Sequence, residues 1–327
     1  MKPFKIIPII AILVCCACAV SVYYLGCTPG GAAFVLNRAL SHTDYVQSYG
    51  YKQIEGSLLQ GLSIRQLVLK GLRDFPEGSE CRLSRLDLGL SSVLPPFNPE
   101  VVFSEGRLFL QGSEPVSFEG RYDSGEIRAR VEARRMNIES LGEFFAQLSA
   151  QARSVSGTLT GADIVLSGPP DELLLKGSLI IEECRYRLFR LRQIPLLFDL
   201  VVRKTGDREL VFGTVSITGG TFSGKKTAPL LLRESSILFD GEPSLAQLDI
   251  TAGAQVDEVV ITARLRGPME RPEFSLSSEP PLSREELLLI LATGYSFRDV
   301  VDSVKRDGGI VDKLKDFFTY EEQYITP

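Results

Sequence analysis

The segment GGTFSGKKT, residues 219–227, has a spacing close to that of a phosphate-binding loop. Its glycines and Lys225 are correctly placed, but Lys226 stands where such a loop needs a Ser or Thr to bind Mg²⁺. The loop must also open a helix whose N-terminus holds the phosphates. Here Pro229 and a strand-like apolar run follow instead. We therefore interpret the segment as a Gly-rich hairpin turn.

Few other residues offer chemistry. His42 is the sole histidine, so neither a histidine-based triad nor a His-rich metal site can be assembled from this chain. The adjacent carboxylates Glu285 and Glu286 fall at the start of an expected helix, where negative charge is favoured electrostatically. We therefore predict no catalytic residue, no cofactor and no metal, and a protein that is not an enzyme.

The cysteines allow two interpretations. Six are present, and four of them lie in or beside the N-terminal apolar run, which leaves Cys81 and Cys184. These two could form a disulfide in an oxidising compartment. The alternative is two small buried side chains, and no cysteine spacing resembles a zinc site.

Composition indicates a folded protein. The 327 residues are enough for one or two domains, and an apolar content of 44% supports a core. The net charge of −5 gives no basic surface for nucleic acid. We therefore expect no nucleic-acid partner.

The N-terminus indicates a membrane anchor. Lys2 and Lys5 precede an uncharged run from residue 6 to residue 26, long enough to cross about 30 Å of hydrocarbon. Lysines before the span place the N-terminus in the cytoplasm and the bulk of the chain in the periplasm. We predict a single-pass inner-membrane signal anchor at residues 1–27. The alternatives are a cleaved signal peptide and a lipoprotein anchored at Cys27.

Alternating apolar and polar residues dominate the rest of the chain. About fifteen short strand candidates with glycines at their ends predict a mainly β fold with an antiparallel-rich sheet. Two segments, GEIRARVEAR at 125–134 and EVVITARLRG at 258–267, alternate most regularly. Their apolar positions are expected to line an apolar face: Ile127, Ala129, Val131, Val259, Ile261, Ala263 and Leu265. The alternative is that these residues fill an ordinary closed sandwich core.

A helical period at residues 137–152 interrupts the strands and divides the β part at about residue 150. We predict an N-terminal β segment with short helices at 28–150 and a C-terminal β domain at 151–294. The stripe of apolar residues beyond it predicts an amphipathic helical tail at 295–327.

The segment FSLSSEPPLSREELLLILATG, residues 274–294, joins a strand to a short helix. Two prolines end the strand, because proline cannot donate to the ladder. Ser283 and Glu286 form a capping box, with Leu282 and Leu287 as a hydrophobic staple. We expect this helix to fold across the terminal strand and cover its edge.

The stretch LRGPMERPEFSLSSEPPLSREELLLILATG strongly resembles the C-terminal signature of the TamB family of translocation and assembly proteins. The segment YKQIEGSLLQGLSIRQLVLKG, residues 51–71, resembles the TamB segment that follows the signal anchor. The resemblance implies a long, curved, taco-shaped β body with an apolar interior. It also implies roles in outer-membrane protein assembly and phospholipid movement, and an outer-membrane barrel partner.

Our main hypothesis is an inner-membrane-anchored periplasmic protein whose apolar groove holds phospholipid acyl chains. The second hypothesis is an assembly factor without a lipid conduit, which docks an outer-membrane barrel assembly protein through its sheet edge or C-terminal helix. The third is the lipoprotein. The residues of the family motif are the docking candidates: Pro280, Pro281, Leu282, Ser283, Glu286, Leu288, Leu291 and Gly294.

Overall fold

The structure is a computed structural model. It describes residue 24 and residues 26–293, apart from residues 43, 74, 91–97, 142–154, 187–188, 207 and 225–228. Seventeen strands belong to one sheet, and the chain divides into two compact units. Unit 1 comprises residues 1–133 and 165–170, and unit 2 comprises residues 134–164 and 171–327. The predicted boundary near residue 150 falls outside the described residues.

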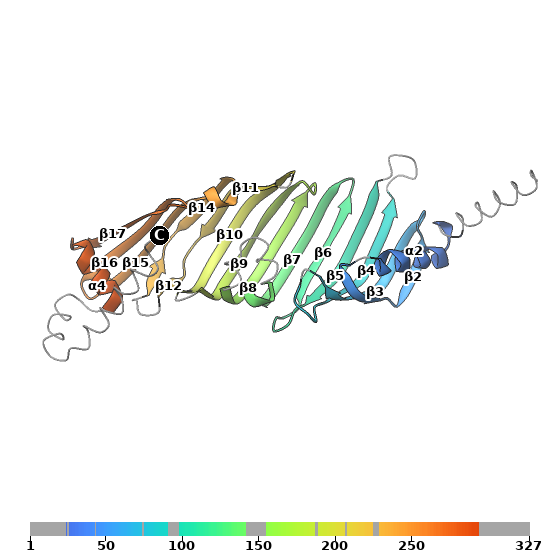
Figure 1. Ribbon diagram of the computed structural model, residues 1–327, viewed down its shortest axis with the longest axis horizontal. Coiled ribbons are helices and arrows are strands. Elements are labelled where there is room, and N and C mark those ends of the chain that lie inside the picture. The colour runs from blue at the N-terminus through green and yellow to red at the C-terminus, as the bar shows by residue number, and fades with distance from the viewer. Residues whose placement is uncertain are drawn as a thin grey trace, which may run out of the picture. The chain divides into compact units, whose positions relative to one another are not determined.

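In unit 1, helix α2 is followed by an antiparallel meander (Figure 1). Its elements are α2 (Pro29–Ser41), β1 (Val46–Gly50), β2 (Gln53–Ser57), β3 (Gly61–Leu72), β4 (Glu80–Leu90), β5 (Pro99–Phe109), β6 (Val116–Asp123) and most of β7 (Glu126–Asn137). Strands β1 and β2 both pair with β3, and each strand from β3 to β6 pairs with the next one along the chain. The regular alternation predicted for residues 125–134 is therefore confirmed as a strand.

The register of unit 1 aligns apolar residues on one face. One row crosses six strands, and its members are Ile54, Ile64, Leu86, Phe103, Gly120 and Ala129. Side chains directly opposite one another on the same face pack together, so each row stabilises the pairing of its strands.

Helix α2 agrees with the expectation of short helices in the N-terminal segment, and it begins at Pro29. The Thr28 hydroxyl caps it by accepting a hydrogen bond from the Gly31 amide at 3.1 Å, and proline suits the first helical position. Fully buried Ala32 then packs against Leu62 and Ile64, so α2 covers one end of the unit 1 apolar face.

Unit 2 contains the longest strands. Its elements are most of β8 (Val155–Gly168), then β9 (Glu172–Tyr186), β10 (Phe189–Thr205), β11 (Arg208–Ile217), β12 (Thr221–Ser223), β13 (Leu230–Leu232), β14 (Ser235–Gly241), β15 (Gln247–Val256), β16 (Val259–Pro268), β17 (Glu273–Glu279) and α4 (Arg284–Thr293). Two 3₁₀ turns, Ile138–Leu141 and Pro243–Leu245, complete it.

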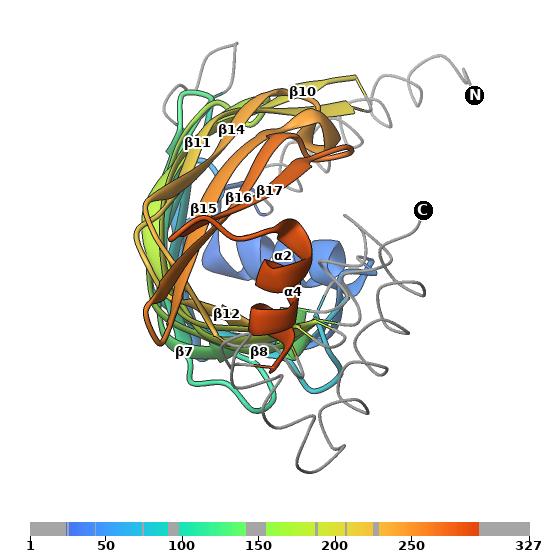
Figure 2. The same ribbon diagram turned by 90° about the vertical axis from the view of Figure 1, so that its left-hand side faces the viewer.

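Antiparallel pairing links the strands of unit 2 from β9 through β10, β11, β14, β15 and β16 to β17. The short strands β12 and β13 form a side branch between β10 and β15. Figure 2 shows that β10 to β17 form a curved sheet with α4 on its concave side. The antiparallel part of the predicted fold class is confirmed.

Several predictions concern segments that lie partly or wholly outside the described residues. Helical periodicity at 137–152 yields only the 3₁₀ turn at 138–141 within the described residues, and 142–154 lie outside them. Most of the predicted anchor at 1–27 and the whole tail at 295–327 are also outside. Among the residues described, no helix is both long enough and apolar enough to cross a membrane.

Candidate functional site

Unit 2 carries a hollow of about 490 Å³ on one face of its sheet. Apart from Arg264, its lining is entirely apolar: Ile181, Leu191, Ile194, Leu196, Val215, Ile217, Phe222, Leu230, Leu232, Ile237, Ile250, Ala252, Ala263, Leu265 and Phe274. We call this surface the apolar hollow. Its size falls in the range typical of small-molecule sites, which are also mostly apolar.

Strand register explains why these side chains lie together. Leu196 of β10 is opposite Ile217 of β11, and Val215 of β11 is opposite Ile237 of β14. Further along the sheet, Ile250 of β15 is opposite Leu265 of β16. Because side chains on a strand alternate between faces, apolar residues in matching register produce one continuous apolar face.

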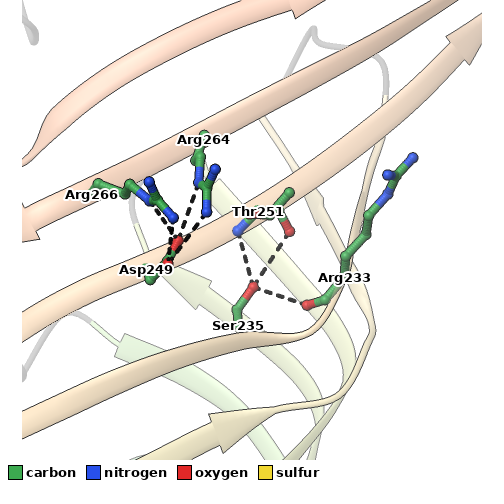
Figure 3. Close-up of polar contacts among 6 residues, drawn as sticks. All are labelled: Arg233, Ser235, Asp249, Thr251, Arg264 and Arg266. Atoms are coloured by element: carbon green, nitrogen blue, oxygen red, sulfur yellow. Dashed lines mark hydrogen bonds and ion pairs between the residues drawn. The ribbon is translucent and has the colours of Figure 1, made fainter.

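The opposite face of the same strands carries ion pairs beside exposed leucines such as Leu197 and Leu238. Asp249 of β15 accepts from Arg264 Nε at 3.2 Å and from Arg266 Nη2 at 3.0 Å, and these side chains cross from β16 to β15 (Figure 3). On the hollow side, buried Ser235 is opposite Ile217, and its hydroxyl accepts from the Thr251 amide at 3.0 Å. The two faces therefore differ in chemistry, as expected for a sheet with one side in water.

Helix α4 closes one end of the apolar face of unit 2. Its buried side chains are Leu287, Ile290 and Leu291, and they pack against Ala254 and Val256 of β15 and Ile261 of β16. Leu276 of β17 packs against the same cluster, and α4 contacts β17. The expected contact of this helix with the terminal strand is therefore confirmed, and coverage of the strand edge stays a prediction.

The predicted start of α4 is confirmed. Glu286 accepts from the Ser283 amide at 2.8 Å, and Ser283 Oγ accepts from the Glu286 amide at 3.3 Å, which is the reciprocal pattern of a capping box. The hydrogen bond from the Ser283 amide lowers the pKa of the Glu286 carboxyl. Leu282 packs on the same cluster as Leu287.

The remaining motif residues take different positions. Pro280 and Pro281 follow the end of β17, Leu288 is half-buried, and Leu291 is buried at 7% exposure. Gly294 lies outside the described residues. Whether any of them meets a partner stays a prediction.

The four lining residues predicted on β16 separate into two groups. Ala263 and Leu265 line the apolar hollow. Ile261 is fully buried beneath α4, and Val259 packs on the same cluster. Contact of any of them with lipid stays a prediction.

The three lining residues predicted on β7 belong to unit 1 and share its apolar face. Ile127, Ala129 and Val131 are half-buried, and Val131 is opposite Phe118 of β6. The Phe118 ring lies over Gly106, where an added Cβ would come within 2.5 Å of it. A glycine at that position therefore leaves room for the aromatic ring on this face.

Sequence patterns missed most of the hollow, which is supplied by β9 to β15. In β10, apolar residues occupy both faces: Leu196 lines the hollow, whereas Leu197 is 51% exposed on the opposite face. A run of apolar residues without alternation does not reveal which side chains point inward. The available signal was the run itself, LLFDLVV at 196–202.

Chemically reactive groups do not gather at the hollow. Cys81 and Cys184 are buried free thiols in units 1 and 2, and burial raises the pKa of Cys81 to about 11. Within the GGTFSGKKT segment, residues 221–223 form β12, which pairs antiparallel with β13 as expected for a hairpin, and residues 225–228 lie outside the described residues. In the described ranges no cluster of His, Cys, Asp and Glu could hold a metal ion.

Comparison with known proteins gives one family. Residues 199–317 match the TamB C-terminal domain. The matched range begins in β10 and includes β11 to β17 and α4, so it contains most of the apolar hollow. The match confirms the resemblance of residues 265–294 to the C-terminal TamB signature, and residues 51–71 lie outside the matched range. Comparisons with curated proteins and with solved structures give no match.

Proposed function

We propose that the chain acts in outer-membrane biogenesis by holding phospholipid acyl chains against its apolar face, on the basis of the match of residues 199–317 to the TamB C-terminal domain. Residues 1–27 anchor it in the inner membrane with the N-terminus in the cytoplasm, and the β units lie in the periplasm. The curved sheet works as a β-taco-like groove through which lipid passes between membranes.

One observation carries the proposal: the apolar hollow is continuous in register across the strands from β9 to β17. A closed core would bury such side chains almost fully. Here most lining residues are only half-buried, and Phe274 is 48% exposed. A partly exposed apolar surface of this kind suits a molecule with a long hydrocarbon chain.

The energetics favour a hydrocarbon ligand. Each methylene group moved from water to an apolar surface gains about 0.8 kcal/mol. Ten methylene groups in contact with the hollow would therefore gain about 8 kcal/mol, before the cost of ordering the chain. No single residue is needed for this binding, which fits a site without reactive groups.

Two adjacent residues of β14 provide the test. Ile237 lines the hollow, and Leu238 is 49% exposed on the opposite face. The full chain is purified from membranes in mild detergent, and phospholipid bound per protein is measured by mass spectrometry. We expect Ile237→Asp to reduce bound phospholipid, because a carboxylate in the hollow repels hydrocarbon. Leu238→Asp, the matched control, should retain it.

Both variants carry the same anchor, so lipid around the anchor cancels in the comparison. Thermal unfolding must show that Ile237→Asp remains folded, and Ile237→Thr replaces it if the aspartate unfolds the sheet. Equal phospholipid in a folded inward variant and in the outward control would contradict the proposal.

A second function, partner docking without a lipid conduit, is favoured by a different observation. Five of the seven residues of β17 are exposed, so this strand offers backbone to an added strand of an outer-membrane barrel assembly protein. Leu291 is buried, so a charge there would disturb packing, whereas half-buried Leu288 can be changed to test docking. Docking predicts that Leu288→Glu leaves melting unchanged and abolishes crosslinking to the outer-membrane partner. Persistent crosslinking in the folded Leu288→Glu protein would contradict it.

A further inference from the structure

Three arginines gather around one carboxylate at one end of the β9–β10 strand pair. Arg185 Nη2 lies 2.8 Å from Glu183 Oε2, and Arg192 Nε lies 3.4 Å from Glu183 Oε1. Arg190 Nε contacts the same Oε1 atom. We call these four residues the arginine cluster. Three positive charges against one negative charge leave a local excess of +2 (3 − 1).

Other ion pairs on these strands are balanced. Lys176 Nζ meets Asp199 Oδ2 at 2.9 Å, and Arg203 Nε meets Glu172 Oε2 at 3.0 Å, each one cation to one anion. An exposed single pair of this kind contributes little to stability. The arginine cluster places three guanidinium groups around one carboxylate, one more than Asp249 receives from Arg264 and Arg266.

The arginine cluster lies at the rim of the sheet. The ladder between β9 and β10 ends with Tyr186 opposite Phe189, and the next pair inward is Arg185 opposite Arg190. A strand rises about 3.3 Å per residue, so Arg185 and Arg190 stand one residue from the rim, and Arg192 opposite Glu183 stands two residues further in. The side chains of Arg185 and Arg190, 54% and 37% exposed, are accessible to a ligand there.

The apolar hollow reaches the same end of the strands. Leu191 and Phe222 both line it, and they are opposite one another in the pairing of β10 with β12. The ring of Phe189 stacks on that of Phe222 with 5.4 Å between centroids, and Phe189 is 38% exposed. Side chains alternate along β10, so apolar Phe189 and Leu191 face the hollow while Arg190 and Arg192 face the other side.

We propose that the arginine cluster is the subsite for the phosphate of an anionic glycerophospholipid whose acyl chain lies in the apolar hollow. Guanidinium groups bind phosphate oxygens through paired, charge-assisted hydrogen bonds. Glu183 holds the arginines together and competes with the incoming phosphate. Hydrogen bonding from Arg185 lowers the pKa of Glu183, which keeps this competing carboxylate ionised at neutral pH. The subsite rests on the proposed function, because the hydrocarbon must occupy the hollow for the headgroup to reach the rim.

The test compares two photoreactive lipids with the same diazirine-bearing acyl chains, phosphatidylglycerol and uncharged diacylglycerol. The full chain in detergent is titrated with each lipid, irradiated, and analysed for labelled peptides of unit 2. We expect the double variant Arg190→Gln/Arg192→Gln to need about tenfold more phosphatidylglycerol for half-maximal labelling, since each arginine near an anionic headgroup changes affinity by a few-fold. Its labelling by diacylglycerol should not change.

The matched control is Lys176→Gln/Arg203→Gln, which removes two charges from the same strand pair away from the arginine cluster. It should label like the wild type with both lipids. Equal loss of phosphatidylglycerol labelling in the two double variants would reduce the effect to net charge and overturn the subsite. Unchanged labelling in Arg190→Gln/Arg192→Gln would also overturn it, while leaving the proposed function intact.

Failure of both lipids to label the hollow of the wild type would instead overturn the proposed function, and the subsite with it. A reciprocal variant tests the role of the carboxylate. Glu183→Gln removes the competitor, so half-maximal labelling should need several-fold less phosphatidylglycerol. No gain in affinity would contradict the competition between Glu183 and the phosphate.

Discussion

Helix α4 should be held on the apolar face by a small number of buried contacts, and Ile261 is the most informative of them. This side chain is fully buried in the cluster with Leu287 and Ile290. Ile261→Ala removes three carbon atoms, worth about 2.4 kcal/mol at 0.8 kcal/mol each, and leaves a cavity that adds to the loss. The expected loss in the free energy of unfolding of unit 2 is therefore about 3 kcal/mol.

Val260 is the matched control for this change. It precedes Ile261 in β16, is 39% exposed and is not part of the cluster, so Val260→Ala should cost less than about 1 kcal/mol. Urea unfolding followed by circular dichroism gives the stability of each variant. Hydrogen exchange of peptides covering 284–293 then reports whether α4 itself loosens.

A double-mutant cycle with Ile290→Ala decides whether the two side chains are coupled. Contacting residues show interaction energies of about 0.5–3 kcal/mol, and we expect a value in this range. If Ile261→Ala costs no more than Val260→Ala, or if the cycle closes to zero, α4 is not packed on the apolar face as described.

Three further outcomes are expected. Cys81 and Cys184 should resist maleimide until the chain is denatured, because both thiols are buried and have raised pKa values; fast labelling of the native protein would contradict this. Glu286→Ala should lower the melting temperature at neutral pH. The pKa of the Glu286 carboxyl is lowered in the folded state. Its contribution to stability is therefore present above the ordinary carboxyl pKa and is lost as the pH falls through the lowered value. A difference in melting temperature between the two proteins that persists in strong acid would refute this. Protease added to spheroplasts should digest the chain beyond about residue 28, and a protected C-terminus would contradict the predicted orientation.

Sequence reasoning was most successful where alternation is strict. In β7 and β16 every second residue is apolar, so both strands and their inward side chains follow from the pattern. Capping chemistry is equally local: Ser283 and Glu286 are three residues apart, and their hydrogen bonds form as that spacing predicts.

Other features depend on contacts that no local pattern encodes. Glu105 and Gln193 have left-handed φ values of 52° and 51° within strands. At Glu105, the register of β5 with β6 shifts between Phe103 and Gly106. Next to Gln193, both Leu191 and Ile194 line the hollow, although they are three residues apart in β10. Such residues break the two-residue period, so alternation alone assigns the following side chains to the wrong face.

The position of α4 was also beyond local reasoning. The leucines of α4 predicted that the helix is buried on one side. The sequence did not show whether they pack on the edge of the last strand or on the apolar face of the sheet. The answer lies in the register of β15 and β16, which places Ala254 opposite Ile261 and so offers a small residue beside a large one. That pairing depends on residues far apart in the chain from α4.

Lipid contact at the apolar hollow can be measured directly in cells. A photocrosslinking amino acid replaces either Leu196, which lines the hollow, or Leu197, which is 51% exposed on the opposite face of the same strand. After irradiation, mass spectrometry identifies what is attached at each position. Our account predicts phospholipid adducts at position 196 and few or none at 197. Equal adducts at the two positions, or none at 196 in the folded protein, would contradict it.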